Sequence, residues 1–102
     1  MRRSQSPTNR DAATLRALAS GLLGRSTGAA HDTVGGRFDE RVVLMLDQLD
    51  HGEAEMALED LASNVYEFGV HVSDAELDQF AEIGSNLGID PDRWSYLCEL
   101  VQ

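Results

Sequence analysis

Residues 52–69, GEAEMALEDLASNVYEFG, form the amphipathic stretch that most constrains the fold of this chain. With each residue placed about 100° after the last, apolar side chains gather on one half of the helical wheel and polar side chains on the other. The apolar half holds Ala54, Ala57, Leu58, Leu61, Ala62, Val65 and Phe68, and the polar half holds Glu53, Glu55, Glu59, Asp60, Ser63, Asn64 and Glu67. Such a helix buries its apolar half against other helices, so the pattern predicts an all-α fold.

The neighbouring segments also have apolar residues at helical spacing. Residues 38–51 are predicted to form a helix that ends at Gly52. Ser73 and Glu76 form an S-x-x-E capping box, in which each side chain accepts a hydrogen bond from the other residue's backbone N–H. This box predicts the start of a helix over residues 74–87.

The C-terminal segment repeats this kind of start. Asp90 is placed to cap a helix, and Pro91 to occupy its first position, where a missing N–H costs nothing. The expected apolar face of this last helix consists of Trp94, Leu97, Cys98, Leu100 and Val101, with Cys98 packed as a small hydrophobic side chain. Four helices joined by short corners predict a compact four-helix antiparallel bundle over residues 37–102.

Residues 1–36 are predicted to be a flexible basic segment that carries one weak helix, over about residues 9–23. The helix is suggested by the spacing of Leu15, Leu18 and Leu22. Residues 1–10 have too few apolar side chains to offset the entropy of ordering, and residues 26–36 have the glycine and serine content of a linker. We therefore expect the N-terminal helix to be loosely attached to the bundle.

Charge is distributed unevenly along the 102 residues. The net charge of −10 comes from 18 acidic and 8 basic residues. Residues 1–37 have a net charge of +4, and residues 38–102 have a net charge of −14. Because binding to phosphates depends on lysine and arginine, this balance argues against a nucleic-acid ligand and favours a basic protein partner.

The same composition bears on the cellular compartment. Cys98 is the single cysteine, so no intrachain disulfide can form. No apolar run approaches the roughly 18 residues of a membrane span, and the basic N-terminus is not followed by the apolar core of a signal peptide. A cytoplasmic protein that does not contact membranes is the simplest expectation.

No stretch has the spacing of a catalytic, cofactor or metal site. His51, Glu53, Glu55 and Glu59 lie close together in the sequence, but they do not form an H-E-x-x-H motif. Asp90 and its neighbours do not match a calcium loop. The carboxylates are too evenly spread for a general acid and base with different environments. We therefore expect no catalytic residues, no cofactor and no bound metal, and hence a binding protein that is not an enzyme.

The polar half of the central helix is the candidate partner-binding surface. None of its acids has a basic residue four positions later, so the carboxylates repel one another along the helix. Any one of them is accounted for by a solvated helix surface, but a one-signed set favours association with a cationic partner. The predicted contacts are Glu55, Glu59, Asp60 and Glu67, with Asp47 and Asp50 flanking them and Met56 and Tyr66 as apolar anchors.

The central stretch and the capping box also resemble a known family. The pattern resembles that of MafI-type immunity proteins of bacterial polymorphic toxin systems over about residues 40–100. The matching positions are Gly52, Glu53, Ala57, Leu58, Glu59, Leu61, Asn64, Glu67, Ser73 and Glu76. Val65 stands where leucine is common, and residues 1–36 have no counterpart in the pattern.

This resemblance implies a small cytoplasmic protein that binds a cognate toxin domain and neutralises it. Many such toxins are nucleases with basic clefts, which an acidic helical surface could block. Two alternatives remain open. One is a helical interaction or adaptor module, such as a weak homodimer that uses Val43, Leu44 and the N-terminal helix. The other is a nucleic-acid mimic that binds basic proteins in general.

Overall fold

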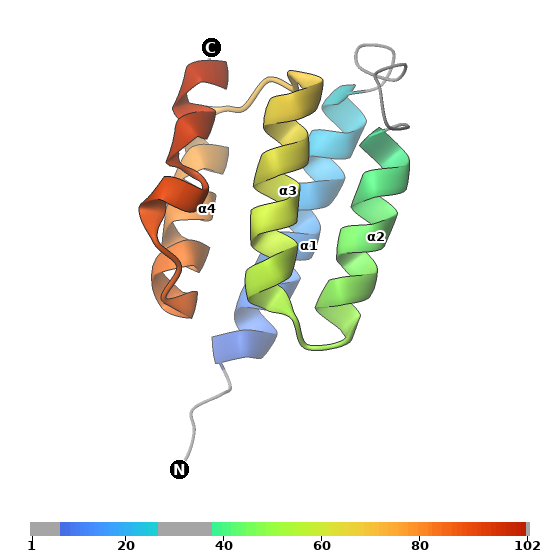
Figure 1. The fold of residues 1–102 in the computed structure, drawn as a ribbon, viewed down its shortest axis with the longest axis vertical. Helices are drawn as coiled ribbons and strands as arrows, with labels where there is room; N and C mark the ends of the chain where they lie inside the picture. Colours follow the sequence, from blue (N-terminus) through green and yellow to red (C-terminus); the bar gives the residue numbers. More distant parts are fainter. Residues whose placement is uncertain (1–6, 27–37, 102) are drawn as a thin grey trace.

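The computed structural model describes residues 7–26 and 38–101 (Figure 1). Its four α-helices are α1 (Pro7–Ser26), α2 (Phe38–Asp50), α3 (Ala54–Phe68) and α4 (Asp74–Leu87). Two short 3₁₀ helices follow, η1 (Pro91–Arg93) and η2 (Ser95–Leu100). The described residues form no strand, although Val72 and Val101 make one isolated bridge. The predicted all-α class is therefore confirmed.

Glycine and serine set the ends of the central helices, as predicted. Gly69 ends α3 with a φ of 66°, a left-handed conformation that glycine adopts without steric cost. Gly52 has a φ of 79° at the corner between α2 and α3. At the start of α4, the Ser73 N–H donates to Glu76 Oε1 over 2.9 Å, and the Glu76 N–H donates to Ser73 Oγ over 3.1 Å. The capping box is thus formed by both of its hydrogen bonds.

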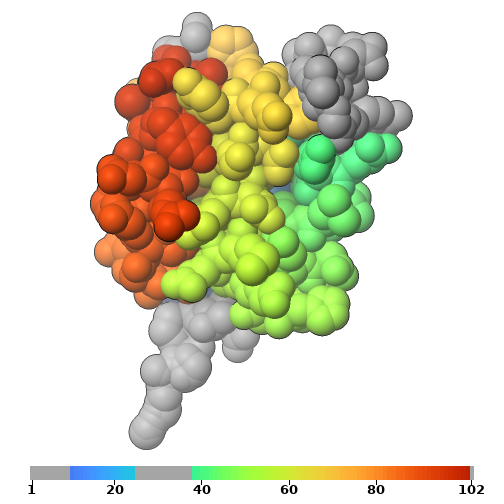
Figure 2. All heavy atoms as spheres, in the orientation of Figure 1, coloured from blue at the N-terminus to red at the C-terminus, as the bar shows by residue number. Residues whose placement is uncertain are grey.

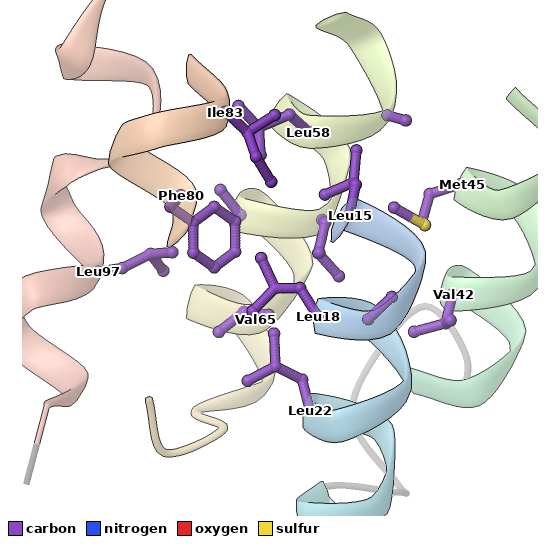
Figure 3. Close-up of a cluster of buried hydrophobic side chains, with 14 of the residues drawn as sticks. Leu15, Leu18, Leu22, Val42, Met45, Leu58, Val65, Phe80, Ile83 and Leu97 are labelled. Atoms are coloured by element: carbon purple, nitrogen blue, oxygen red, sulfur yellow. The ribbon is translucent and has the colours of Figure 1, made fainter. Parts of the chain in front are cut away.

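Helix α1 is part of the core, and the prediction that it is loosely attached is wrong. Leu15, Leu18, Ala19 and Leu22 lie on one face of α1 and are buried. Figure 3 shows the three leucines beside core side chains of the other helices, among them Val65 and Phe80. A stripe at i, i+3, i+4 and i+7 is enough to dock a helix, because tertiary packing contributes more than helix propensity.

The N-terminal predictions also differ from the structure in extent. Helix α1 continues past Gly24 to Ser26, so Gly24 does not end it. The predicted tail and linker lie mostly in residues 1–6 and 27–37, outside the described residues. One core cluster joins α1 with side chains from residues 38–101.

The C-terminal segment is not the predicted α-helix. Asp90 does cap its start, by accepting a hydrogen bond from the Asp92 N–H over 3.0 Å, but the chain then forms η1 and η2. The partly or fully buried Trp94, Leu97 and Leu100 recur every three residues, which is the period of a 3₁₀ helix. Cys98 falls outside this period and is exposed, so the prediction that it packs as a core side chain is wrong.

Trp94 packs directly on α4 at Gly84, which is buried. A Cβ at Gly84 would lie 2.8 Å from Trp94 Nε1 and 3.2 Å from Trp94 Cδ1. We therefore expect Gly84→Ala to lower the free energy of unfolding by about 1–3 kcal/mol, the usual cost of overpacking. Urea denaturation followed by circular dichroism measures this change.

Gly24→Ala is the matched control, because a Cβ at Gly24 meets no atom within 4 Å. This substitution in α1 should be neutral or stabilise the protein by up to about 1 kcal/mol, since alanine favours helix over glycine. Equal effects of the two substitutions would show that Gly84 is not needed for the close approach of Trp94.

Candidate partner-binding surface

The outer surface of α3 lies between α2 on one side and the C-terminal turns on the other. In the space-filling view, α3 runs through the middle of the visible face, with α2 in green to its right and η1 and η2 in red to its left (Figure 2). The eight predicted contact residues all lie on α2 or α3. The structure does not gather them into one patch but divides them among three neighbourhoods.

The first neighbourhood is a groove between α2 and α3 with a volume of about 480 Å³. We call it the α2–α3 groove. Each helix contributes one stripe of side chains at the spacing i, i+3, i+4, i+7. These stripes are Arg41, Leu44, Met45 and Gln48 from α2, and Asp60, Ser63, Asn64 and Glu67 from α3. Asp47 of α2 also lines the groove. Three predicted contact residues, Asp47, Asp60 and Glu67, are therefore brought together here.

Several groove residues were not predicted as contacts. Arg41, Gln48, Ser63 and Asn64 are polar side chains that a search for acids passes over. One hydrogen-bond donor of Asn64 is already used within the chain, because its Nδ2 donates to the Asp60 backbone carbonyl over 2.8 Å. The signal that could have identified the groove is the pair of matching helical stripes, combined with the tight Gly52 corner that places α2 beside α3.

The second neighbourhood joins α3 to the C-terminal turns. Arg93 Nη1 lies 3.5 Å from Glu59 Oε1, and the Tyr66 hydroxyl donates to Glu99 Oε1 over 2.8 Å. The rings of Tyr66 and Tyr96 meet edge to face, with their centroids 5.1 Å apart. Glu59 and Tyr66, two predicted contact residues, are thus engaged in contacts within the chain.

Two tyrosine pKa values reflect this second neighbourhood. The hydrogen bond to Glu99, and then the charge of Glu99, raise the pKa of Tyr66. Burial, followed by the charge of Glu59, raises the pKa of Tyr96. Both hydroxyls therefore stay protonated to a higher pH than that of an unperturbed tyrosine, and Tyr66 keeps its role as a hydrogen-bond donor.

The third neighbourhood is the corner between α2 and α3. Arg16 Nη2 of α1 lies 2.6 Å from Asp50 Oδ1, so this predicted contact residue forms an ion pair with the N-terminal helix. Glu55 and Met56 line a shallow hollow with Leu87 of α4. A hydrogen bond between His51 Nδ1 and the Asp47 backbone carbonyl, and then the Asp47 charge, raise the pKa of His51 above 6.5.

Exposed apolar side chains accompany the carboxylates. Val43 and Leu44 of α2 are 63% and 59% exposed, and Met56 and Tyr66 of α3 are 49% and 43% exposed. Val43 and Leu44, the α2 residues named for the alternative homodimer, form an uncovered edge on the described surface. Such residues are the kind that a partner covers.

Within residues 7–26 and 38–101, no three His, Cys, Asp or Glu side chains are arranged to hold a metal ion. None of the helices in these ranges has the length and apolar character to cross a membrane. Comparison with protein-family models, curated proteins and solved structures finds no match for this chain.

Proposed function

We propose that this chain is an immunity protein of the MafI type, which binds a cognate bacterial toxin domain in the cytoplasm and neutralises it. The observation that supports the proposal is the surface of α2 and α3, where the carboxylates of Asp47, Asp60 and Glu67 lie around one groove beside exposed Leu44. The proposal includes an antiparallel arrangement of the helices and a role in binding, not catalysis.

Charge complementarity supports a nuclease as the toxin. A nuclease binds a polyanion, so its substrate cleft carries lysine and arginine. Carboxylates at fixed positions on two packed helices can oppose these cations and exclude the nucleic acid. The opposite charges also steer the two proteins together and raise the rate of association.

Co-expression with the toxin domain encoded beside this gene tests the proposal. We expect bacteria that produce the toxin domain alone to stop growing, and bacteria that also produce this chain to grow. The two proteins should co-purify as a complex when the toxin is catalytically inactive. Equal toxicity in both cultures would show that this chain is not its immunity protein.

A homodimeric or adaptor module is the second candidate, and the exposure of Val43 and Leu44 favours it. The apolar face of α1 is buried in the core, so such a dimer would use the α2 edge alone. Sedimentation equilibrium would then show a stable dimer without a toxin complex. A general nucleic-acid mimic would instead bind several unrelated basic proteins.

A further inference from the structure

We propose that the partner docks in the α2–α3 groove, and that the groove receives an arginine or lysine side chain flanked by an aliphatic residue. This inference rests on the proposed function and narrows it. It places the contact with the partner on the side of α3 that faces α2. The opposite side of α3, where Glu59 and Tyr66 lie, is then not part of the binding surface.

The walls of the groove carry the charge for such a side chain. Asp47, Asp60 and Glu67 contribute three carboxylates, against the single guanidinium of Arg41 among the lining residues. Within the described part of the chain, the side-chain carboxylates of Asp60 and Glu67 make no ion pair, whereas Asp47 only approaches the exposed His51 at 3.7 Å. A cation from a partner can therefore pair with Asp60 and Glu67 without displacing an ion pair of the described residues.

One of the groove-lining residues has a buried side-chain acceptor that lacks a hydrogen-bond partner among the described residues. Gln48 Oε1 is a buried atom without a hydrogen-bond partner among the described residues, and Gln48 lines the groove. Buried amide oxygens are normally paired, because water is no longer there to replace a lost hydrogen bond. An arginine presents five N–H donors and a lysine three, so either can pair with a carboxylate and also donate to Gln48 when that side chain turns its oxygen toward the groove.

The rim of the groove offers an apolar surface on which an aliphatic group of the partner can pack. Leu44 lines the groove and, with Val43, forms the exposed apolar edge of α2. Arginine and lysine carry an apolar stem that packs on such side chains while the charged end reaches polar groups. A second copy of this chain does not suit the site, because it would place one acidic surface against another.

The opposite side of α3 lacks these properties. Glu59 lies beside Arg93, Tyr66 donates to Glu99, and the Tyr66 ring packs on Tyr96. A partner that used these groups would first have to break contacts that hold the C-terminal turns against α3. Glu59 and Asp60 are adjacent in sequence, yet only Asp60 faces the groove.

Two matched double variants test the assignment in the complex with the inactive toxin domain. Asp60→Asn with Glu67→Gln removes two charges from the groove. Glu59→Gln with Glu99→Gln removes two charges from the opposite side, so the net charge is equal. We expect the first pair to raise the Kd about tenfold or more and the second to change it less than about threefold, measured by calorimetry.

Leu44→Ser should also weaken binding, because it removes the apolar rim. Thermal unfolding of each variant shows whether the protein remains folded. If the wild-type chain binds the toxin and the groove variants bind equally well, the groove assignment is wrong while the immunity function stands. Stronger loss from the Glu59 and Glu99 pair would also overturn the assignment.

If the wild-type chain does not bind the toxin, the proposed function fails. A peptide then tests separately whether the groove binds an arginine side chain. The probe is a helical peptide of leucine, arginine and alanine, with a second peptide that has glutamine in place of arginine. Amide shifts in NMR spectra of the full chain should cluster at groove residues such as Gln48, Asn64 and Glu67 with the arginine peptide only. Shifts elsewhere, or none, would contradict the inference.

Discussion

Leu15→Ala should lower the free energy of unfolding by about 2–5 kcal/mol, whereas Leu44→Ala should change it by less than about 0.5 kcal/mol. Both substitutions remove the same atoms from a leucine in a helix. Leu15 has no exposed surface, and it packs in the core that α1 shares with the other helices, whereas Leu44 is 59% exposed. The difference between the two substitutions thus measures how firmly α1 is held in the core.

Urea denaturation of the full-length chain measures both values. Because small domains have a total stability of only about 5–15 kcal/mol, Leu15→Ala can unfold much of the protein. Leu15→Met, which nearly conserves volume, should cost less than about 1.5 kcal/mol and shows that the loss comes from the cavity. Equal, small effects of Leu15→Ala and Leu44→Ala would mean that α1 does not stabilise the fold.

The same pair separates stability from binding. Leu44 lies on the rim of the α2–α3 groove, so Leu44→Ala should weaken binding to the partner while the fold keeps its stability. Leu15→Ala should lower stability and, in the fraction that remains folded, leave the affinity unchanged. A residue of the core and a residue of the proposed interface are thereby distinguished by one type of substitution.

Much of the helical content was predictable because local chemistry decides it. Gly52 and Gly69 adopt left-handed conformations next to helices, and Ser73 with Glu76 forms a two-sided cap, so residues within a few positions set these ends. The contribution of α1 was underestimated for a different reason. Three leucines and Ala19 suffice for docking only when other helices provide a complementary surface, and the sequence does not show that surface.

The C-terminal turns illustrate a limit of periodicity. Trp94, Leu97 and Leu100 fit a 3₁₀ helix, but with Cys98 and Val101 they also fit one face of an α-helix. Two contacts accompany the 3₁₀ form. Trp94 packs on Gly84, and the Val72 N–H donates to the Leu100 carbonyl over 3.2 Å. Both contacts join residues that are distant in the sequence, so spacing alone could not choose between the two forms.

The candidate site was predictable only in part, for the same reason. The helical wheel placed Glu59, Asp60 and Glu67 on one polar half, but it could not tell which neighbouring element each would face. Arg93 lies beside Glu59 across 34 positions of sequence, so a search for bases at i+4 does not find it. The polar half of α3 is divided by its neighbours. Packing of α2 beside it forms the groove on one side, and packing of the C-terminal turns engages Glu59 and Tyr66 on the other.

The largest expected effect on association comes from reversing charge in the groove. With Asp60→Lys and Glu67→Lys, we expect the rate of association with the toxin domain to fall by about 10-fold to 1,000-fold at low salt, the range over which electrostatic steering acts. The wild-type rate should fall steeply as salt is raised, because ions screen attraction beyond a Debye length of about 8–10 Å. Stopped-flow measurements at several salt concentrations give both quantities.

Asp78→Lys with Glu82→Lys is the control, because both residues are exposed on α4 and the change in net charge is the same. If the field of the groove steers the partner, this control should keep most of the rate and most of its dependence on salt, while the groove variant loses both. If the two variants lose equally, the total charge of the protein attracts the partner and no single face directs it. The comparison therefore distinguishes attraction by the total negative charge of the protein from steering by the α2–α3 groove, in which the positions of the carboxylates matter as much as their sign.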